Sequence, residues 1–350
     1  MKRRLILRGA SLLPFLTNFD NDNKEFQMNE QSAHKKVIKP KRLKVGDTLG
    51  VVALASSVSE KAIARATESL RGLGFKLKFG KNLNAQKGYL AGTDEQRLED
   101  LHWAFSDPEV DAVWCIRGGY GVTRILPKVD FKLIKKNPKI FIGYSDITAL
   151  HVAIHQKTGL VTFHGPVGTS DYTAFTKPNV LNVLTNPTPQ YKLVHSEENL
   201  KKESNLFKPE VIKAGKCRGQ LIGGNLSLLS ALDGTPFALG NLKGKILFME
   251  DIDERPYRID RMLTQMLQSH DLTKLAGIAL GVFEGCNPKP DENSLSLIEC
   301  LKDRLGNLGI PVIYGLSFGH ISNQYTLPVG IEAEMDTATG TLTLLETAVL

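Results

Sequence analysis

Short apolar runs and longer amphipathic stretches alternate along residues 43–171. The apolar runs predict buried strands at 50–55, 76–79, 112–116 and 139–142. The stretches with helical spacing of apolar side chains are 60–73, 93–106 and 146–158. Gly74 and Gly159 follow the first and third of these helices as stop signals, and Thr93 is placed to cap the second. Strands that alternate with helices in this way predict a parallel sheet covered by helices on both faces.

This alternation stops between residues 172 and 215, where proline-containing and charged runs replace the regular apolar spacing. We interpret this stretch as a connection between two domains. Beyond it, the pattern predicts strands at 244–249 and 277–282, a helix at 258–268 and a β-rich end at 326–345. The expected organisation is a leader or tail at 1–40, an α/β domain at 41–171, the connection at 172–215 and a β-rich domain at 216–350.

Composition and charge narrow the function classes. The chain of 350 residues is 42% hydrophobic and 23% charged, as expected of a globular protein. It has no run of about 18 apolar residues, so we expect no stable membrane insertion. The net charge of +7 belongs to residues 1–44, which hold 11 Lys or Arg and 4 Asp or Glu out of 44 and 37 in the chain. The remainder holds 33 of each sign, and such a balanced body argues against a nucleic-acid partner.

The cysteines are widely scattered and form no CxxC pair, which argues against a zinc site. A chain of this length does not need disulfides to hold its core, so buried free thiols are expected. The four are Cys115, Cys217, Cys286 and Cys300.

The N-terminus combines positive charge with a short apolar run. Arg3 and Arg4, followed by three apolar residues and Arg8, resemble a twin-arginine export signal, and residues 10–16 are mostly apolar. No Ala-x-Ala cleavage site follows this short run, so a disordered basic tail is an equal alternative. A signal would place the protein in the periplasm, whereas a tail would leave it in the cytoplasm.

The first chemical candidate is the turn at 143–146, where an apolar strand ends at a glycine and Ser145 precedes a helix. A nucleophile elbow has this arrangement, because the turn holds the hydroxyl out of the sheet beside the free amides of the helix. The G-x-S-x-G pattern fails at Ile147, however. A plain helix N-cap is the alternative, since serine and aspartate are common at that position.

A second candidate is the glycine loop at 117–121, which also follows a strand and is expected beside the Ser145 turn. Glycines let backbone N–H groups approach a ligand, as in an oxyanion hole or a phosphate cradle. The loop lacks the GxGxxG spacing and a Lys-Ser/Thr pair, so it fits a nucleotide poorly. An ordinary tight turn is the alternative.

A serine nucleophile needs a base and a carboxylate to orient it. His320 is the candidate base, because it follows a strand-like segment and no helical periodicity assigns it to the core. Glu250 and Asp251, directly after an apolar strand, are the candidate acids, with a charged surface turn as the alternative. His151 and His155 lie one helical turn apart, but no HExxH frame surrounds them, and a helix surface explains them better than a metal site.

Taken together, these motifs resemble the serine LD-carboxypeptidase, or muramoyltetrapeptide carboxypeptidase, family, which includes the microcin-immunity peptidases. The resemblance runs from about residue 40 to the C-terminus with the motifs in order. The segments that carry it are 43–50 with 55–57, 117–121, 143–146, 223–226, 250–251 with 256–261, and 318–320.

The resemblance implies a flavodoxin-like parallel-sheet N-terminal domain, a smaller β-rich C-terminal domain and an active site between them. It assigns the nucleophile to Ser145, the acid to Glu250 rather than Asp251, and the base to His320. It also implies an oxyanion hole built from the backbone amides of Gly118 or Gly119 and Asp146.

The implied reaction is hydrolysis of the L,D-peptide bond before a C-terminal D-alanine in murein tetrapeptides, without metal or other cofactor. Arg117 and Tyr144 are the candidate substrate-binding residues, the former for the substrate carboxylate. The resemblance also implies a homodimer. Two alternatives stay open, a microcin-immunity-like peptidase acting on peptidyl-nucleotides and a muropeptide-binding protein without turnover.

Overall fold

The structure, a computed structural model, describes residues 36–350. The export signal or basic tail expected at the N-terminus lies outside these residues. Within the described range, no helix is both long enough and apolar enough to cross a bilayer.

The first half of the described chain forms a parallel sheet, as predicted. Five strands run parallel in the order β5-β4-β3-β1-β2, and β12 from near the C-terminus adds antiparallel to β5. The strands are β1 (Thr48–Val52), β2 (Lys76–Phe79), β3 (Ala112–Cys115), β4 (Ile140–Gly143), β5 (Thr162–His164) and β12 (Leu327–Val329). The helices of this half are α1 (Glu60–Gly72), α2 (Asp94–Ser106), α3 (Val122–Ile125), α4 (Phe131–Lys136) and α5 (Thr148–Thr158).

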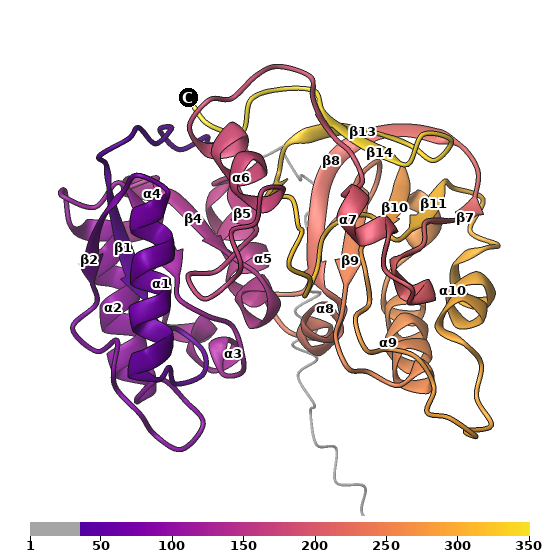
Figure 1. Cartoon of the computed structure of the whole chain (residues 1–350), viewed down its shortest axis with the longest axis horizontal. Helices are drawn as coiled ribbons and strands as arrows, with labels where there is room; N and C mark the ends of the chain where they lie inside the picture. The colour runs from indigo at the N-terminus through magenta and orange to yellow at the C-terminus, as the bar shows by residue number, and fades with distance from the viewer. Residues whose placement is uncertain (1–35) are drawn as a thin grey trace, which may run out of the picture. The chain divides into compact units, whose positions relative to one another are not determined.

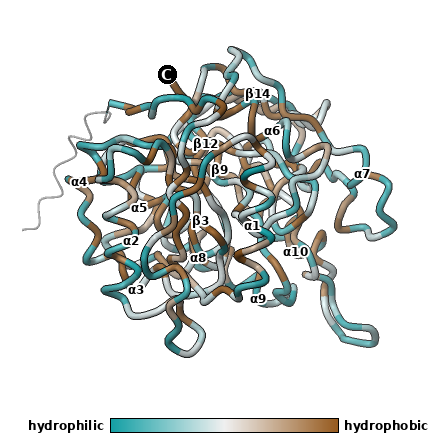
Figure 2. The backbone as a smooth tube through the Cα atoms, turned by 60° about the vertical axis from the view of Figure 1, so that its left-hand side comes forward, coloured by the Kyte–Doolittle hydropathy of each residue, from teal (hydrophilic) through white to brown (hydrophobic). Residues whose placement is uncertain are grey.

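Helices cover both faces of this sheet (Figure 1). Alternate strand residues pack into two different cores. Val51 and Trp114 share one core with Leu70 of α1, whereas Val52 and Val113 share the other with α2 and α5. Figure 2 shows the corresponding hydropathy, with apolar segments gathered along the central strands and polar ones along the outer turns. The continuous apolar runs in the sequence therefore reflect strands that are buried on both sides.

The helix boundaries that the sequence predicted rest on specific caps. Thr93 accepts a hydrogen bond from the Gln96 amide, and the Gln96 side chain accepts one from the Thr93 amide, which completes a capping box for α2. Gly159 ends α5 in the left-handed conformation, with φ of 82°. Both boundary predictions are confirmed.

The second sheet has eight strands in the order β6-β14-β13-β8-β9-β10-β11-β7 and is mixed. Strands β8 to β11 are parallel, and the outer pairs are antiparallel. The strands are β6 (Tyr191–Leu193), β7 (Glu210–Lys213), β8 (Lys216–Asn225), β9 (Ile246–Glu250), β10 (Gly277–Leu280), β11 (Val312–Tyr314), β13 (Glu332–Asp336) and β14 (Thr341–Leu344). The helices are α6 (Thr176–Leu184), α7 (Glu197–Leu200), α8 (Leu226–Leu232), α9 (Pro256–Ser269) and α10 (Leu297–Leu305). The β-rich character of this half is confirmed.

Several segments pair differently from what their place in the sequence suggests. The stretch at 172–215, interpreted as a connection, contributes β6 and β7, the two edge strands of the second sheet. Conversely, β12 leaves the β-rich half to pair with β5 of the first sheet. The domain boundaries and the homodimer stay predictions.

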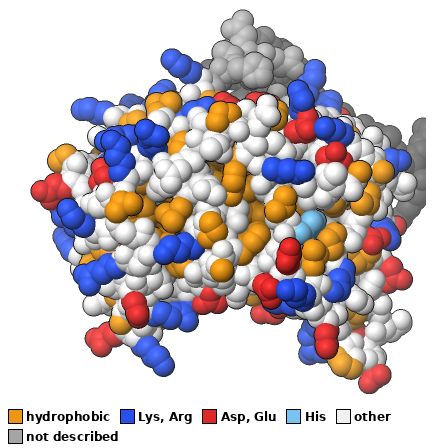
Figure 3. Space-filling model, turned by 45° about the horizontal axis from the view of Figure 1, so that its top comes forward, with side chains coloured by type: hydrophobic (Ala, Val, Ile, Leu, Met, Phe, Trp, Pro, Cys, Tyr) orange, Lys and Arg blue, Asp and Glu red, His pale blue; other side chains and the backbone are white. Residues whose placement is uncertain are grey.

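The cysteines are free thiols, and Cys115, Cys286 and Cys300 are buried as expected. Cys217 is only half-buried on β8. Burial raises the pKa of Cys217 to about 11 and that of Cys300 to about 12, so these thiols stay protonated at neutral pH. On the face shown in Figure 3, side chains of both charge signs are interspersed.

Replacing Thr93 by alanine removes the hydroxyl that caps α2 and leaves the Gln96 amide without its acceptor. We expect the free energy of unfolding to fall by about 1 kcal/mol, measured by denaturant titration. Ser106→Ala at the other end of α2 removes an exposed hydroxyl and serves as the control, with an expected change below about 0.5 kcal/mol. Equal effects of the two substitutions would contradict the capping assignment.

Candidate active site

The structure brings together the three residues that the resemblance assigned to catalysis. Ser145 follows β4 of the first sheet, Glu250 ends β9 of the second, and His320 lies in the loop after β11. His320 Nδ1 lies 2.7 Å from Glu250 Oε2. Ser145 and His320 both line one cavity of about 370 Å³. The other residues that line it are Val58, Ala62, Arg117, Gly118, Gly119, Tyr144, Val167 and Thr169.

Ser145 occupies a strained turn. Its φ is 64°, in the left-handed region that non-glycine residues rarely adopt, and a short 3₁₀ turn over Ser145–Ile147 leads into α5. Gly143 is closely packed, because a Cβ there would lie only 3.1 Å from Cys115 Cβ and from Ile147. A strained serine between a buried strand and a helix fits a nucleophile elbow better than a plain cap.

The glycine loop approaches Ser145 with bare backbone. A Cβ on Gly118 would lie 2.8 Å from Ser145 Cβ and 3.1 Å from its Oγ. Gly119 has φ of 122°, and a Cβ there would collide with Ser56. Within residues 36–350, no acceptor is found for the amides of Gly118 and Gly119. These two N–H groups are therefore available to a ligand beside the Ser145 hydroxyl, as an oxyanion hole requires.

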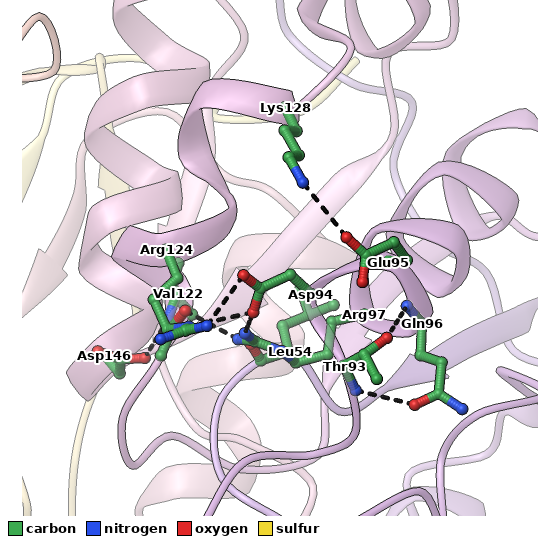
Figure 4. Close-up of polar contacts among 11 residues, drawn as sticks. Leu54, Thr93, Asp94, Glu95, Gln96, Arg97, Val122, Arg124, Lys128 and Asp146 are labelled. Carbon is green, nitrogen blue, oxygen red and sulfur yellow. Dashed lines mark hydrogen bonds and ion pairs between the residues drawn. The ribbon is translucent and has the colours of Figure 1, made fainter. Parts of the chain in front are cut away.

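A buried arginine, Arg97, anchors this loop through hydrogen bonds (Figure 4). Arg97 Nη1 donates to the carbonyls of Leu54 and Gly121, both at 2.8 Å, and Nη2 contacts Asp94 at 2.5 Å. The amide of Val122 donates at 2.8 Å to the carboxylate of Asp146, the residue after Ser145. The glycine loop is thus tied both to the end of β1 and to the nucleophile turn.

The sequence did not lead us to Arg97, although a signal was present. On α2 it lies one turn before Leu101, on the side where helical spacing places core residues, and it is almost fully buried. Burial also raises the pKa of Asp146 to about 6, although the Val122 amide opposes the shift.

Glu250 is fully buried, and its pairing with His320 sets the electrostatics of the site. Burial alone would raise the pKa of Glu250, but the charge and hydrogen bond of His320 outweigh it and hold that pKa below its usual value. Burial likewise opposes protonation of His320, yet Glu250 raises the pKa of this imidazole above its usual value. Gly319, with φ of 120°, leaves the space for the loop to pass Glu250.

Asp251, the other candidate acid, is occupied by hydrogen bonds that hold neighbouring segments. Its carboxylate accepts hydrogen bonds from Asn225 Nδ2, from the amide and hydroxyl of Ser227 and from the Ile252 amide. Burial raises its pKa to about 6, with a further contribution from Glu250. Of the two acids, Glu250 is the one hydrogen-bonded to His320.

The two candidate substrate-binding residues border the same cavity. Arg117 Nη1 donates to the Ser57 carbonyl at 2.9 Å, which fixes the guanidinium at the cavity wall. The Tyr144 ring packs edge-on against the His320 ring, with centroids 4.8 Å apart. Arg117 therefore supplies positive charge, and Tyr144 restricts the movement of the imidazole.

The helix-surface interpretation is wrong for His151. This side chain is fully buried, because α5 packs against β5, β8 and α8, and its Nε2 lies 2.8 Å from the Gly143 carbonyl. Burial lowers the pKa of His151 to about 3, so the ring is neutral. Among the described residues, no group of three or more His, Cys, Asp or Glu side chains is arranged to hold a metal ion.

Comparison with known protein families gives two matches, in chain order. Residues 49–165 match the LD-carboxypeptidase N-terminal domain, and residues 218–335 match the LD-carboxypeptidase C-terminal domain. Together these segments contain Ser145, Glu250 and His320.

Individual proteins align over most of their length. The chain is 47% identical over 305 residues to a probable murein peptide carboxypeptidase of Bacillus subtilis, covering 86% of this chain and 92% of that protein. It is 30% identical over 322 residues to a microcin self-immunity protein, MccF, of Escherichia coli. This alignment covers 84% of this chain and 92% of that protein. The solved structure of a muramoyltetrapeptide carboxypeptidase from Oxalobacter formigenes superposes with a TM-score of 0.72 at 32% sequence identity. The superposition covers 85% of this chain and 97% of that one.

Gly118→Ala tests the close approach of the glycine loop. The added methyl would contact Ser145 and displace one of the two amides, so we expect kcat for peptide hydrolysis to fall about 100-fold or more. The melting temperature should change little. Gly72→Ala, where a Cβ meets nothing within 4 Å, is the matched control and should retain full activity. Full activity in Gly118→Ala would remove the loop from the site.

Proposed function

Because this chain belongs to the LD-carboxypeptidase family, a family of serine hydrolases, we propose that it releases the C-terminal D-alanine of murein tetrapeptides by a Ser145–His320–Glu250 triad. The observation that carries the proposal is the hydrogen bond between buried Glu250 and His320, at a cavity that Ser145 also lines. The relatives whose names specify murein peptides supply the substrate class.

The proposed chemistry is acyl transfer to water. His320 accepts the proton of the Ser145 hydroxyl as its oxygen attacks the carbonyl carbon of the scissile amide. Glu250 keeps the imidazole in the useful tautomer and stabilises the imidazolium that forms. His320 then protonates the departing amine of D-alanine, and water hydrolyses the acyl-enzyme with His320 again as base.

The oxyanion of each tetrahedral intermediate would be stabilised by backbone amides. Those of Gly118 and Gly119 have no acceptor within the described chain, and that of Asp146 lies in the first turn after Ser145, where N–H groups lack helical partners. Pre-oriented donors of this kind lower the barrier by about 3–4 kcal/mol each.

Recognition of a chain end needs a cation for the terminal carboxylate. Arg117 is placed for this role, since it lines the cavity beside Gly118 and Gly119. A guanidinium binds a carboxylate through two parallel N–H groups. A substrate that ends in D-alanine would therefore be held by its carboxylate, with the scissile carbonyl directed to the glycine loop.

The similarity to a microcin self-immunity protein keeps peptidyl-nucleotides as a second candidate substrate. A nucleobase needs an aromatic platform. Neither tryptophan lines the cavity, and Tyr144, which does, is packed edge-on against the His320 ring. Trp114 is fully buried with its Nε1 donating to the Pro166 carbonyl, and Trp103 Nε1 donates to Asp107. These placements favour the murein peptide.

Incubation of the protein with a murein tetrapeptide and, separately, with a peptidyl-adenylate, followed by mass spectrometry, tests the assignment. We expect D-alanine to be released from the tetrapeptide by the native protein and by the control Ser106→Ala, and not by Ser145→Ala. Cleavage of the adenylate alone would identify an immunity-type peptidase. Tight binding of the tetrapeptide without release would identify a binding protein.

The Glu250–His320 pair predicts the pH dependence. His320 must be neutral to act as base, and Glu250 raises its pKa, so kcat/KM should rise with pH through a midpoint above about 6.5. Glu250→Gln removes the charge, so the midpoint should move to lower pH while the plateau falls about 1,000- to 10,000-fold. Glu68→Gln, an exposed site on α1, is the control. An unchanged midpoint in Glu250→Gln would contradict the pairing.

A further inference from the structure

One oxygen of the buried Glu250 carboxylate has no partner. Oε2 pairs with His320 Nδ1, whereas Oε1 makes no hydrogen bond of normal geometry among residues 36–350. The Asn225 side chain is near enough to help lower the Glu250 pKa, but its Nδ2 donates to Asp251. An ionised carboxylate without exposed surface strongly favours a donor for each oxygen, because it cannot be solvated by bulk water. The triad acid therefore has an unfilled acceptor inside the protein.

His164 is placed to fill it. Its Nε2 lies 4.0 Å from Glu250 Oε1, both side chains are fully buried, and neither ring nitrogen of His164 has a partner in the described part of the chain. His164 ends β5, where it pairs with Gly143 of β4. Glu250 Oε1 and both ring nitrogens of His164 are thus buried without partners, next to strand β4, which leads to Ser145.

The imidazole of His164 acts as a neutral donor. Burial lowers its pKa to about 4, so at neutral pH one ring nitrogen carries a hydrogen and the other accepts. A separation of 4.0 Å exceeds a direct hydrogen bond, and it closes by a ring movement of about 1 Å or through one bridging water. In both cases the N–H of His164 serves Oε1.

Aromatic packing holds the ring in this orientation. Phe248 and Tyr144 contact it edge-on, with ring centroids 5.4 and 6.1 Å away, and Phe318 is nearly perpendicular at 6.4 Å. Phe248 lies two residues before Glu250 on β9, so the ring and the carboxylate are positioned by one strand. The His151 ring also lies beside it, with centroids 6.3 Å apart, and His151 Nε2 is bonded to the Gly143 carbonyl.

We propose that His164 is a positioning residue for catalysis, whose Nε2–H donates to Glu250 Oε1 and fixes the carboxylate with Oε2 directed at His320 Nδ1. The proposal rests on the triad proposed above. It also links the two sheets, because His164 belongs to the first and Glu250 to the second.

The effect on pH dependence follows from the charges that face this pair. With His320 neutral and Glu250 ionised, the pair carries one negative charge, which the His164 N–H stabilises. Protonation of His320 neutralises the pair, so loss of the donor destabilises the active form more than the protonated one. The pKa of the pair therefore rises when the donor is removed. The other titratable groups around the pair are Tyr144, His151, Asp251 and Asp253.

The test compares His164→Phe, which keeps the ring volume without a donor, with His164→Gln, which keeps a donor at similar reach. In His164→Phe we expect kcat for D-alanine release to fall about tenfold or more, KM to stay within about twofold, and the acid midpoint of kcat/KM to rise by about half to one pH unit. His164→Gln should recover most of kcat and the native midpoint. His102→Phe, which removes a ring that accepts from the Asp130 amide, is the control and should shift neither.

If His164→Phe does not fold, His164→Asn replaces it, since its shorter side chain withdraws the donor from Oε1. Native kcat and midpoint in the donor-free variant, or equal losses in the donor-free variant and His164→Gln, would overturn the proposal. These outcomes are separable from failure of the triad: if Ser145→Ala and Glu250→Gln abolish release and His164→Phe does not, only the role of His164 is wrong.

Discussion

The burial of the Glu250 carboxylate is the constraint on which the site depends. A carboxylate without exposed surface persists as an anion only with hydrogen-bond donors nearby, and His320 Nδ1 provides one at 2.7 Å. The same burial makes the interaction strong, because little water screens it. The imidazole is thereby held in one tautomer and one orientation, as a general base requires, and Gly319 lets its loop pass close enough to be held.

This pair lies on the second sheet and Ser145 on the first, so the site requires that the sheets be locked together. Thr148, near the start of α5, accepts a hydrogen bond from the Asn225 amide of β8 at 2.9 Å, and Gly224 packs against the same threonine where no Cβ would fit. Strand β12 crosses back to β5, and each of the two apolar cores contains residues of both sheets. Movement of one sheet against the other is therefore costly, and the site is pre-organised.

Local signals explain what the sequence revealed. Thr93 and Gly159 define helix ends through their own hydrogen bonds and φ, and an apolar run that stops at Gly143 predicts the Ser145 turn without knowledge of the rest. Local signals of this kind do not show which strands pair when the strands are distant in the sequence. Strands β6 and β7 are three or four residues long, so no periodicity marks them. Strand β12 falls in the predicted β-rich end, but its pairing with β5 of the other sheet leaves no trace in the sequence. The sequence alone also does not reveal the roles of Arg97 and His164, because both depend on burial by segments that are distant in the chain.

The distribution of charge at the cavity supports cleavage at a chain end rather than within a chain. Among the residues that line it, Arg117 carries the only permanent charge, and the remainder are small, apolar or hydroxyl side chains and His320. A single guanidinium beside the glycine loop binds a substrate carboxylate through paired, charge-assisted N–H groups, which is a stronger interaction than it makes with the neutral carbonyls of an internal peptide segment. Because Arg117 donates to the carbonyl of Ser57, it stays at the wall with further N–H groups to offer. A guanidinium and a serine hydroxyl that line one cavity are the arrangement expected for the proposed cleavage next to a terminal carboxylate.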